Sequence, residues 1–422
     1  MYKKIDHCRI CGNKNLTKFL DLGTQALNGV FPLPGESVGS MPVEAVYCSG
    51  HYPEVCNLIQ LNHTYQLSSM YGDNYGYRSG LNNSMVEHLR GIVGDALDLQ
   101  KGILQDGDLI IDIGSNDSTL LRSYKKFDKK LDLVGIDPTG LKFKEHYSDD
   151  IKLIPDFFGS PEVSAQLGGK KAKVITSIAM FYDLEDPISF CKEIEKCLDP
   201  VHGVWIFEQA YAPVTIEKNG IDCFCQEHLE YYGVRQIQWI LQRAGLGIIK
   251  VDFNSANGGS FRVFASNLLS SRFQPDGEAI NKIAEMEGDL FKTEEVFTQF
   301  SNRIEGEKNK LLAFLEQAKV EGKKVFGLGA STKFNVILQY YNVTPDLLPF
   351  ISEVNEFKFG RLTPGTNIPI ISEKEAEALA PDFYVVGPYH FKDNIIARMS
   401  TFLEKGGALV FPLPEFTIVT KN

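Results

Sequence analysis

The stretch LIIDIGSNDSTLL, residues 109–121, decides the fold of the middle of this 422-residue chain. Its apolar start has the composition of a buried strand, and a turn with one glycine, Gly114, leads into an apolar, helix-like segment. A lysine-rich polar stretch follows, and then a second strand-like run, Leu133 to Ile136, ends on Asp137. Strand, glycine turn, helix, strand and acid is the order of a nucleotide-binding βαβ unit.

The turn in this unit differs from a dinucleotide-binding turn. Such a turn uses three glycines to bring a pyrophosphate against the helix N-terminus, whereas here Gly114 is followed by Ser115, Asn116 and Asp117. An acidic turn with one glycine suits a cofactor that is cationic and carries no phosphate, which describes S-adenosylmethionine. Asp137 is placed to accept the ribose hydroxyls. We therefore expect a cofactor site formed by Asp112, Gly114, Ser115, Asn116, Asp137 and Phe157.

The composition is that of an ordinary globular protein, with 43% hydrophobic and 23% charged residues, and the length allows two or three domains. No apolar run reaches the roughly 18 residues that span a bilayer, and the N-terminus lacks the apolar core of a signal peptide. We expect a cytoplasmic protein with no membrane partner. The formal net charge of -11 argues against a nucleic-acid partner.

Cysteines mark the first 70 residues, which are rich in loops and short of apolar runs. Cys8 and Cys11 form a CxxC pair, and Cys48 and Cys56 can complete a tetrahedral zinc site. His51 competes with Cys56 as the fourth ligand. A small domain with so little core needs such a metal to fold, and four protein ligands leave no open position, so the zinc is expected to be structural.

Strand and helix patterns alternate from about residue 71 to residue 270, which predicts a mostly parallel sheet with helices on both faces and a ligand at the strand C-termini. Residues 275–322 have the spacing of one or two long amphipathic helices. They lead into a second α/β unit with a glycine turn from Gly327 to Lys333. This turn is either an anion cradle or a tight turn without a ligand. The predicted domains are 1–70, 71–270 and 271–422.

Two polar and aromatic segments are candidates for chemistry. Glu227 and His228 are adjacent within Asp222–Tyr232, and a histidine is the natural general base near neutral pH, although a structural histidine is the commoner case. The loop Tyr71–Gly80, which includes Tyr75 and Tyr77, precedes the sheet domain and is either functional or a linker.

Together these segments resemble the S-adenosylmethionine-dependent C-methyltransferases that act on nucleotide-linked keto-deoxysugars. The similar segments follow the family's order: its four-cysteine zinc module, its Y-x-Y-x-S loop at Tyr75–Ser79, its cofactor turn at Asp112–Asp117 and its E-H-L-x-Y-Y segment at Glu227–Tyr232. Asn257–Ser260, Gly327–Lys333 and Pro364–Thr366 extend the resemblance to the C-terminal region.

The resemblance implies a class I methyltransferase-like sheet, a small N-terminal zinc module and a C-terminal Rossmann-like domain. It also implies that a base removes the proton alpha to a ketone and that the enolate carbon takes the methyl group. His228 matches the family base, Glu227 its neighbouring carboxylate, and Tyr75 and Tyr77 the loop tyrosines. Substrate contacts are expected from Arg78, Lys333, Lys358 and Arg361.

The chain departs from the family pattern on the substrate side. Asp183 stands where the family has a histidine, Cys225-Gln226 replaces Tyr-His before the Glu-His pair, and Ser118 replaces a glycine. These changes leave open the sugar, the carbon that is methylated and the proton-transfer partners. An O-methyltransferase, or a methyltransferase on a non-sugar acceptor, is the alternative.

Overall fold

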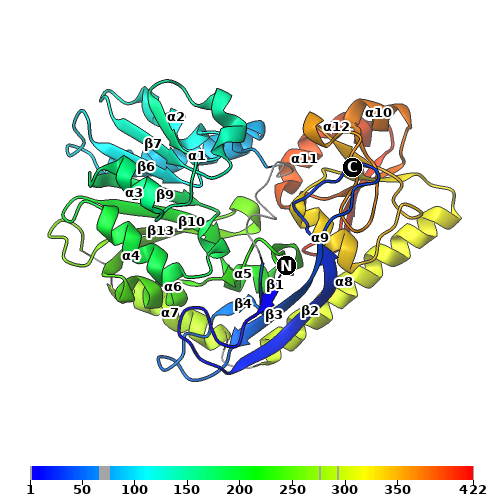
Figure 1. Cartoon of the computed structure of the whole chain (residues 1–422). Helices are drawn as coiled ribbons and strands as arrows, with labels where there is room; N and C mark the ends of the chain where they lie inside the picture. The colour runs from blue at the N-terminus through cyan, green and yellow to red at the C-terminus, as the bar shows by residue number, and fades with distance from the viewer. Residues whose placement is uncertain (1, 66–76, 275–276, 292–293, 422) are drawn as a thin grey trace.

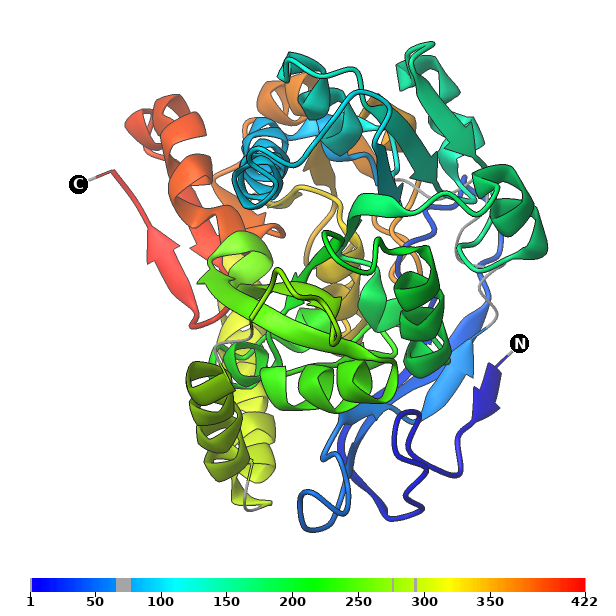
Figure 2. The same cartoon turned by 90° about the vertical axis from the view of Figure 1, so that its left-hand side faces the viewer.

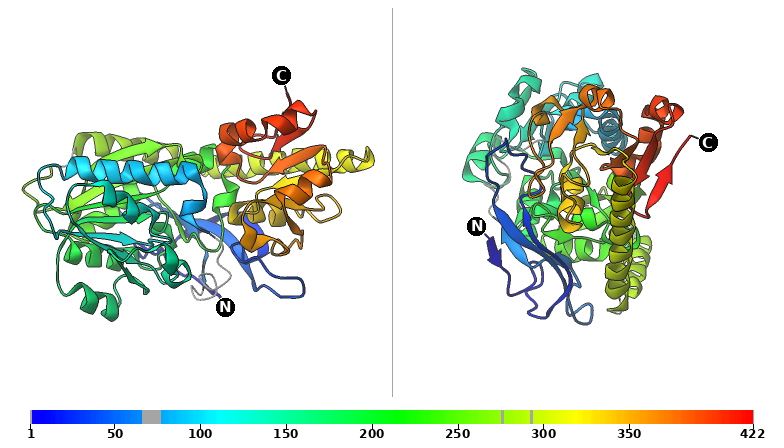
Figure 3. Two further views of the ribbon diagram at one scale, coloured as in Figure 1. Left: turned by 90° about the horizontal axis from the view of Figure 1, so that it is seen from above. Right: turned by 90° about the vertical axis from the view of Figure 1, so that its right-hand side faces the viewer.

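The structure is a computed structural model that describes residues 2–65, 77–274, 277–291 and 294–421. Two α/β domains lie side by side, and the N-terminal strands pack below and between them (Figure 1). The view from above shows the two domains at opposite ends of an elongated molecule (Figure 3). Within the described residues, none of the helices has both the length and the apolar character needed to cross a bilayer.

The middle domain is built on a seven-stranded sheet with the order β12-β13-β10-β9-β6-β7-β8. Its strands, in chain order, are β6 (Leu109–Ile113), β7 (Asp132–Ile136), β8 (Ile151–Ile154), β9 (Ala172–Ile178), β10 (Val204–Ala210), β12 (Leu246–Asn254) and β13 (Ser260–Asn267). β6 to β10 pair in parallel, whereas β13 is antiparallel to both β10 and β12. This order and direction confirm the predicted class I methyltransferase-like sheet.

Helices cover both faces of this sheet (Figure 2). They are α1 (Asn83–Leu99), α2 (Thr119–Ser123), α3 (Pro161–Leu167), α4 (Pro187–Cys197) and α6 (Val234–Arg243). The short helix α5 (Ala212–Glu217) follows β10 and instead packs into the core of the N- and C-terminal domains. α1 buries one stripe, Leu89, Ile92, Val93 and Ala96, because residues three and four apart share a helix face. Asn82 begins α1 by accepting a hydrogen bond from the Ser84 backbone N–H.

The N-terminal region forms a four-stranded antiparallel sheet with the order β11-β4-β3-β2. β2 (Leu16–Ala26), β3 (Ser40–Cys48) and β4 (Ile59–Leu61) come from this region, but β11 (Glu230–Tyr231) comes from the middle of the chain. A separate pair joins β1 (Tyr2–Lys4) to β5 (His63–Tyr65). The zinc module is therefore completed by a strand that lies outside the predicted segment 1–70.

Two helices, α7 (Gly277–Leu290) and α8 (Glu295–Val320), occupy the segment where the sequence predicted long amphipathic helices. The C-terminal sheet follows with the order β16-β15-β14-β17-β18-β19 and is parallel except for β19. Its strands are β14 (Val325–Leu328), β15 (Ile351–Glu353), β16 (Ile370–Ser372), β17 (Phe383–Val386), β18 (Ala408–Phe411) and β19 (Thr417–Val419). Its helices are α9 (Thr332–Tyr340), α10 (Glu373–Ala378), α11 (Lys392–Arg398) and α12 (Ser400–Glu404). This is the expected Rossmann-like α/β unit.

Candidate active site

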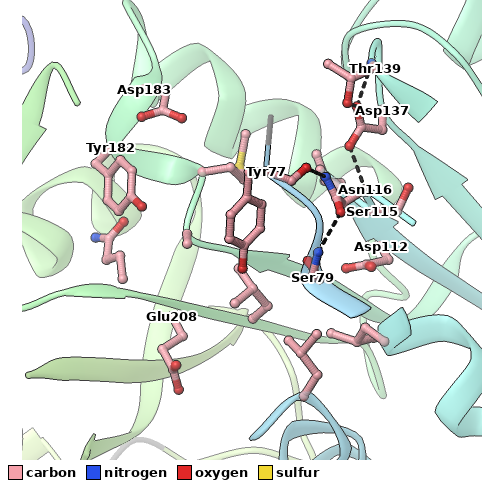
Figure 4. A pocket seen from close by; sticks show the side chains of 18 of the residues that line it. Tyr77, Ser79, Asp112, Ser115, Asn116, Asp137, Thr139, Tyr182, Asp183 and Glu208 are labelled. Atoms are coloured by element: carbon pink, nitrogen blue, oxygen red, sulfur yellow. Dashed lines mark hydrogen bonds between the residues drawn. The ribbon is translucent and has the colours of Figure 1, made fainter. Parts of the chain in front are cut away.

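A cavity lies at the C-terminal ends of β6, β7, β9 and β10, where a parallel sheet places its ligands. Residues that are far apart in the chain line it, among them the cofactor turn, the segment around His228, and Lys333 of the C-terminal domain. In Figure 4, Tyr182 and Asp183 lie on one side of Tyr77, and Asp112, Ser115, Asn116, Asp137 and Thr139 lie on the other. The cavity thus has a cofactor-turn side and an opposite side that we call the acceptor side.

Asp137 holds the cofactor turn in place. Its Oδ2 accepts a hydrogen bond from the Asn116 backbone N–H at 2.7 Å, and its Oδ1 accepts from the backbone N–H and the hydroxyl of Thr139 at 2.6 and 2.7 Å. A carboxylate can accept about four hydrogen bonds, so these three leave capacity for a ribose hydroxyl. The carboxylate therefore organises the turn before any ligand is bound.

Asp112 lies at the end of β6 and is buried, with the Thr176 hydroxyl donating to its Oδ1 at 2.6 Å. Burial raises the pKa of Asp112 to about 7. Gly114 adopts φ 72°, and a Cβ there would lie only 3.3 Å from the Met180 side chain, so the turn needs glycine at this point. Phe157 also lines the cavity and is 48% exposed.

The acidic group in the turn has a different partner from the one that the sequence predicted. Asp117 is fully buried and accepts hydrogen bonds from the Gly80 backbone N–H at 3.0 Å and from Arg78 Nε at 3.3 Å. Asn116 accepts from the Ser79 N–H at 3.0 Å. Asp117 therefore anchors the preceding loop. The expected substrate residue Arg78 is bound to Asp117, and Tyr75 lies outside the described residues.

His228 lines the cavity, and a hydrogen bond at Nδ1 fixes which of its two ring nitrogens carries the proton. Nδ1 is 3.0 Å from the Cys223 carbonyl oxygen and donates to it, so Nε2 is the nitrogen without a proton. The ring packs on Tyr182 with 4.2 Å between centroids. Burial, together with the nearby charge of Lys333, lowers the pKa of His228 to about 4. The imidazole is therefore neutral near pH 7 and can accept a proton.

Glu227 lies beside His228, with a carboxylate oxygen within 4.8 Å of a ring nitrogen of His228. Burial raises the pKa of Glu227 to about 7. The carboxylate packs so closely on Gly29 that a Cβ at that position would overlap it. Glu227 does not line the cavity. Its carboxylate lies between His228 and the N-terminal domain, which it contacts at Gly29.

Lys333 is the C-terminal residue that reaches the cavity. Its Nζ lies 3.3 Å from the Asn257 carbonyl oxygen and 3.9 Å from Asp222 Oδ2. Asp222 is fully buried and also accepts from Tyr389 at 2.6 Å and from His390 at 2.9 Å. Burial alone would raise the pKa of Asp222, but His390 and Lys333 lower it to about 2. This ionised carboxylate ties two domains together beside the cavity.

Lys358 and Arg361 lie outside the cavity lining. Lys358 donates to the Ala330 carbonyl at 2.7 Å, and Arg361 donates to the Phe31 and Phe357 carbonyls. The glycine turn before α9 is not an open anion cradle either. Glu353 accepts the Ala330 N–H at 2.8 Å, so a resident carboxylate occupies the position where a phosphate was considered.

The four N-terminal cysteines converge on one point. The Sγ atoms of Cys8 and Cys56 are 3.4 Å apart, those of Cys11 and Cys48 are 3.5 Å apart, and all four lie within 4.8 Å of one another. Thiolates around a tetrahedral zinc with bonds of about 2.3 Å would be about 3.8 Å apart, so the cluster fits zinc. His51 is exposed and is not part of this group.

The structure also brings in residues that the sequence did not single out. Glu208, at the end of β10, pairs with His88 of α1 and with Arg262, whose Nε donates to it at 2.9 Å. Gln209 follows it and lines the cavity. The C-terminal end of a parallel strand was a signal for Glu208 and Gln209. His88 is far away in the sequence and carried no such signal.

Three family models match the chain in order. They are described as "Putative zinc binding domain", over residues 8–71, "Methyltransferase domain", over 85–251, and "C-methyltransferase C-terminal domain", over 255–414. Together the three models describe a methyltransferase with a zinc-binding domain, and the chain is an enzyme that uses S-adenosylmethionine and has a four-cysteine zinc site.

Two relatives match different lengths of the chain. The C-methyltransferase NovU of Streptomyces niveus is 25% identical over 423 aligned positions, which cover 99% of this chain and 98% of NovU. The carboxy-S-adenosyl-L-methionine synthase of Nautilia profundicola is 30% identical over 125 residues, or 29% of this chain and 52% of that protein.

Two solved structures that match the chain each cover less than half of it. A methyltransferase bound to the Trm112 activator of Haloferax volcanii matches with a TM-score of 0.36 and 16% identity, over 44% of this chain and 94% of that one. The magnesium protoporphyrin IX methyltransferase of Synechocystis with bound S-adenosylhomocysteine matches with a TM-score of 0.33 and 17% identity, over 48% and 92%.

Proposed function

We propose that the protein methylates a carbon of a nucleotide diphosphate keto-deoxysugar, next to the ketone. The observation that carries the proposal is His228, a neutral histidine with a free Nε2 in the same cavity as the cofactor turn. Removal of a proton alpha to a carbonyl needs such a base, and O-methylation of an acidic hydroxyl has less need of it.

His228 Nε2 takes the α-proton, and the electrons of the C–H bond form the enolate. S-adenosylmethionine, when bound, supplies an electrophilic methyl group. The enolate carbon would take this methyl group as the methyl–sulfur bond breaks and the electron pair of that bond stays on the sulfur, which leaves as the neutral thioether of S-adenosylhomocysteine. The ketone is thereby restored, and the imidazolium returns its proton to solvent. Because burial disfavours the charged ring, a nearby anion is needed to stabilise the imidazolium, and Glu227 is placed behind it for that role.

The remaining cavity residues support this chemistry by binding and orientation. Tyr77 lines the cavity between its two sides and is placed to donate to the developing enolate oxygen (Figure 4). Lys333 is the cation at the C-terminal wall and would contact the diphosphate. We assign no substrate contact to Lys358 and Arg361, because they lie outside the cavity lining and donate to backbone carbonyls.

The test is turnover of a panel of nucleotide-linked keto-deoxysugars with a 13C-methyl donor, followed by NMR of the product. A new carbon-bound methyl group next to the ketone is expected, and an acceptor deuterated at that carbon must lose its deuterium. Retention of deuterium with a new O-methyl signal would instead establish the O-methyltransferase alternative.

Replacement of His228 tests the base itself. His228→Gln is expected to lower kcat by about 10²- to 10⁴-fold while the Kd for S-adenosylhomocysteine stays within about twofold. His202→Gln is the matched control, since His202 lies at the opposite end of the sheet, next to Asp199. Normal turnover by His228→Gln would eliminate His228 as the base.

A further inference from the structure

Gln209 is a buried side chain whose polar atoms have no hydrogen-bond partner in the part of the chain that the structure describes. It lies near the end of β10 and is 2% exposed. Among the described residues, neither its Nε2 nor its Oε1 has a hydrogen-bond partner, and the residue lines the cavity. Burying an amide without partners costs free energy, so a native protein retains one where a ligand completes it.

Another buried glutamine shows the usual arrangement. Gln226 is 1% exposed, and its Nε2 donates to the carbonyls of Gln25 and Ala26, both at 3.2 Å. Its Oε1 accepts from the backbone and the side chain of Asn28. Both ends of the Gln226 amide are thus used within the protein. Gln209 differs because it faces a cavity instead of a neighbouring chain segment.

The position of Gln209 on the strand assigns it to the acceptor side. Side chains alternate along a strand, so Gln209 continues the face of Trp205 and Phe207, which pack on Phe181. Phe181 begins the short helix that ends at Asp183, on the acceptor side in Figure 4. β10 is three strands away from β7 and Asp137, or roughly 14 Å at the spacing of a sheet, so the ribose site is distant.

We propose that Gln209 recognises a hydroxyl group of the acceptor and selects acceptors that carry it. One hydroxyl can donate to Oε1 and accept from Nε2 at the same time, which satisfies both ends of the amide. An acceptor without that hydroxyl leaves the amide buried and unpaired, so it is bound more weakly in the transition state and its kcat/KM is lower. This inference rests on the proposed function, because it assumes a sugar-like acceptor in the cavity.

The first experiment measures the Tm of the zinc-loaded protein without ligands. Gln209→Met replaces an unpaired amide by an apolar chain of similar length, so the Tm is expected to stay the same or rise. Gln100→Met is the matched control: Gln100 is 1% exposed, and its Oε1 also has no hydrogen-bond partner among the described residues, but its Nε2 donates to the Lys173 and His202 carbonyls at 3.0 and 2.6 Å. Its loss should lower the Tm by about 3 °C or more. An equal fall for Gln209→Met would overturn the proposal, because the amide would then have a structural partner.

The second experiment compares two nucleoside-diphosphate-linked keto-deoxysugars that differ by one ring hydroxyl, tested for each ring position. The wild-type protein should prefer one hydroxylated acceptor by at least about tenfold in kcat/KM, and Gln209→Met should remove that preference with S-adenosylhomocysteine affinity unchanged. A preference that survives the substitution, or a loss of cofactor affinity, would overturn the inference. No methylation of any sugar by the wild-type protein would instead overturn the proposed function.

Discussion

Asp137→Asn tests whether one carboxylate organises the cofactor turn. The substitution keeps the size of the side chain but replaces one carboxylate oxygen by an NH2 group. Asp137 accepts three hydrogen bonds, one from Asn116 and two from Thr139. Each carboxylate oxygen accepts a hydrogen bond from a backbone N–H, and an NH2 group cannot accept one. In either orientation of the new amide, its NH2 group therefore replaces one of these acceptors. At least one bond to a charged group is therefore lost.

The size of the effect follows from that bond. A hydrogen bond to a charged group contributes about 1.5 to 3 kcal/mol, and every 1.4 kcal/mol is a factor of ten in affinity. The Kd for S-adenosylhomocysteine is therefore expected to rise by about 10- to 150-fold. Thr139→Val is the matched control, because it removes only the hydroxyl that donates to Oδ1 at 2.7 Å. A neutral hydroxyl bond of this kind contributes about 1 kcal/mol, which is about fivefold.

Isothermal titration calorimetry with S-adenosylhomocysteine measures both variants, and circular dichroism confirms that each remains folded. The expected order of Kd is wild type, Thr139→Val, then Asp137→Asn. Binding by Asp137→Asn within twofold of wild type would refute the reasoning. So would equal losses in the two variants, because the charge on the carboxylate would then contribute nothing.

Three further predictions concern the metal, the pH dependence and the domain junction. Cys56→Ala leaves three thiolates, so bound zinc measured by elemental analysis should fall below one per chain and the Tm should fall; full zinc content would contradict the four-thiolate site. Burial raises the pKa of Glu227 from 4.5 to about 7, so its contribution to stability is present below pH 4.5 and is lost as the pH rises through 7. Between pH 5 and pH 8.5, wild type should lose about 2 to 3 kcal/mol more unfolding free energy than Glu227→Gln in urea titrations, and equal losses would count against a buried carboxyl. Asp222→Asn leaves Lys333 and His390 without their carboxylate and should lower the free energy of unfolding by about 3 to 5 kcal/mol, whereas a change under about 1 kcal/mol would show that the cluster adds no stability.

The sequence was most informative where local pattern and tertiary structure agree. The run from residue 109 to residue 137 encodes its own strand, turn and second strand, and the structure has them as β6 and β7. The pairing of Glu208 with His88 joins residues 120 positions apart, so no local pattern could predict it. The hydrogen-bond partners of the acidic turn could not be predicted for a related reason. Asp117 has its partners in the loop at residues 78–80, and partners cannot be read from the turn alone.

The charged side chains of the C-terminal domain show the same limit. Lys333, Lys358 and Arg361 look equivalent in sequence as candidate substrate cations of the C-terminal region. Only the fold separates Lys333, which lines the cavity, from the two whose donors satisfy backbone carbonyls. Glu353 could not be foreseen as the occupant of the turn, because it arrives from the neighbouring strand β15.

β11 connects the zinc-bearing sheet directly to the segment that carries His228. Leu229 donates its N–H to the Tyr182 carbonyl and accepts the N–H of Leu61, both at 2.8 Å. Glu230 and Tyr231 then pair with Gln60 and Ile59. The zinc-binding domain therefore cannot be exchanged without changing a contact of the methyltransferase domain. A chimera that exchanges residues 1–71 with those of a relative also exchanges the backbone partner of the base-bearing segment, so its catalytic rate would depend on how well the two parents match at β4 and β11.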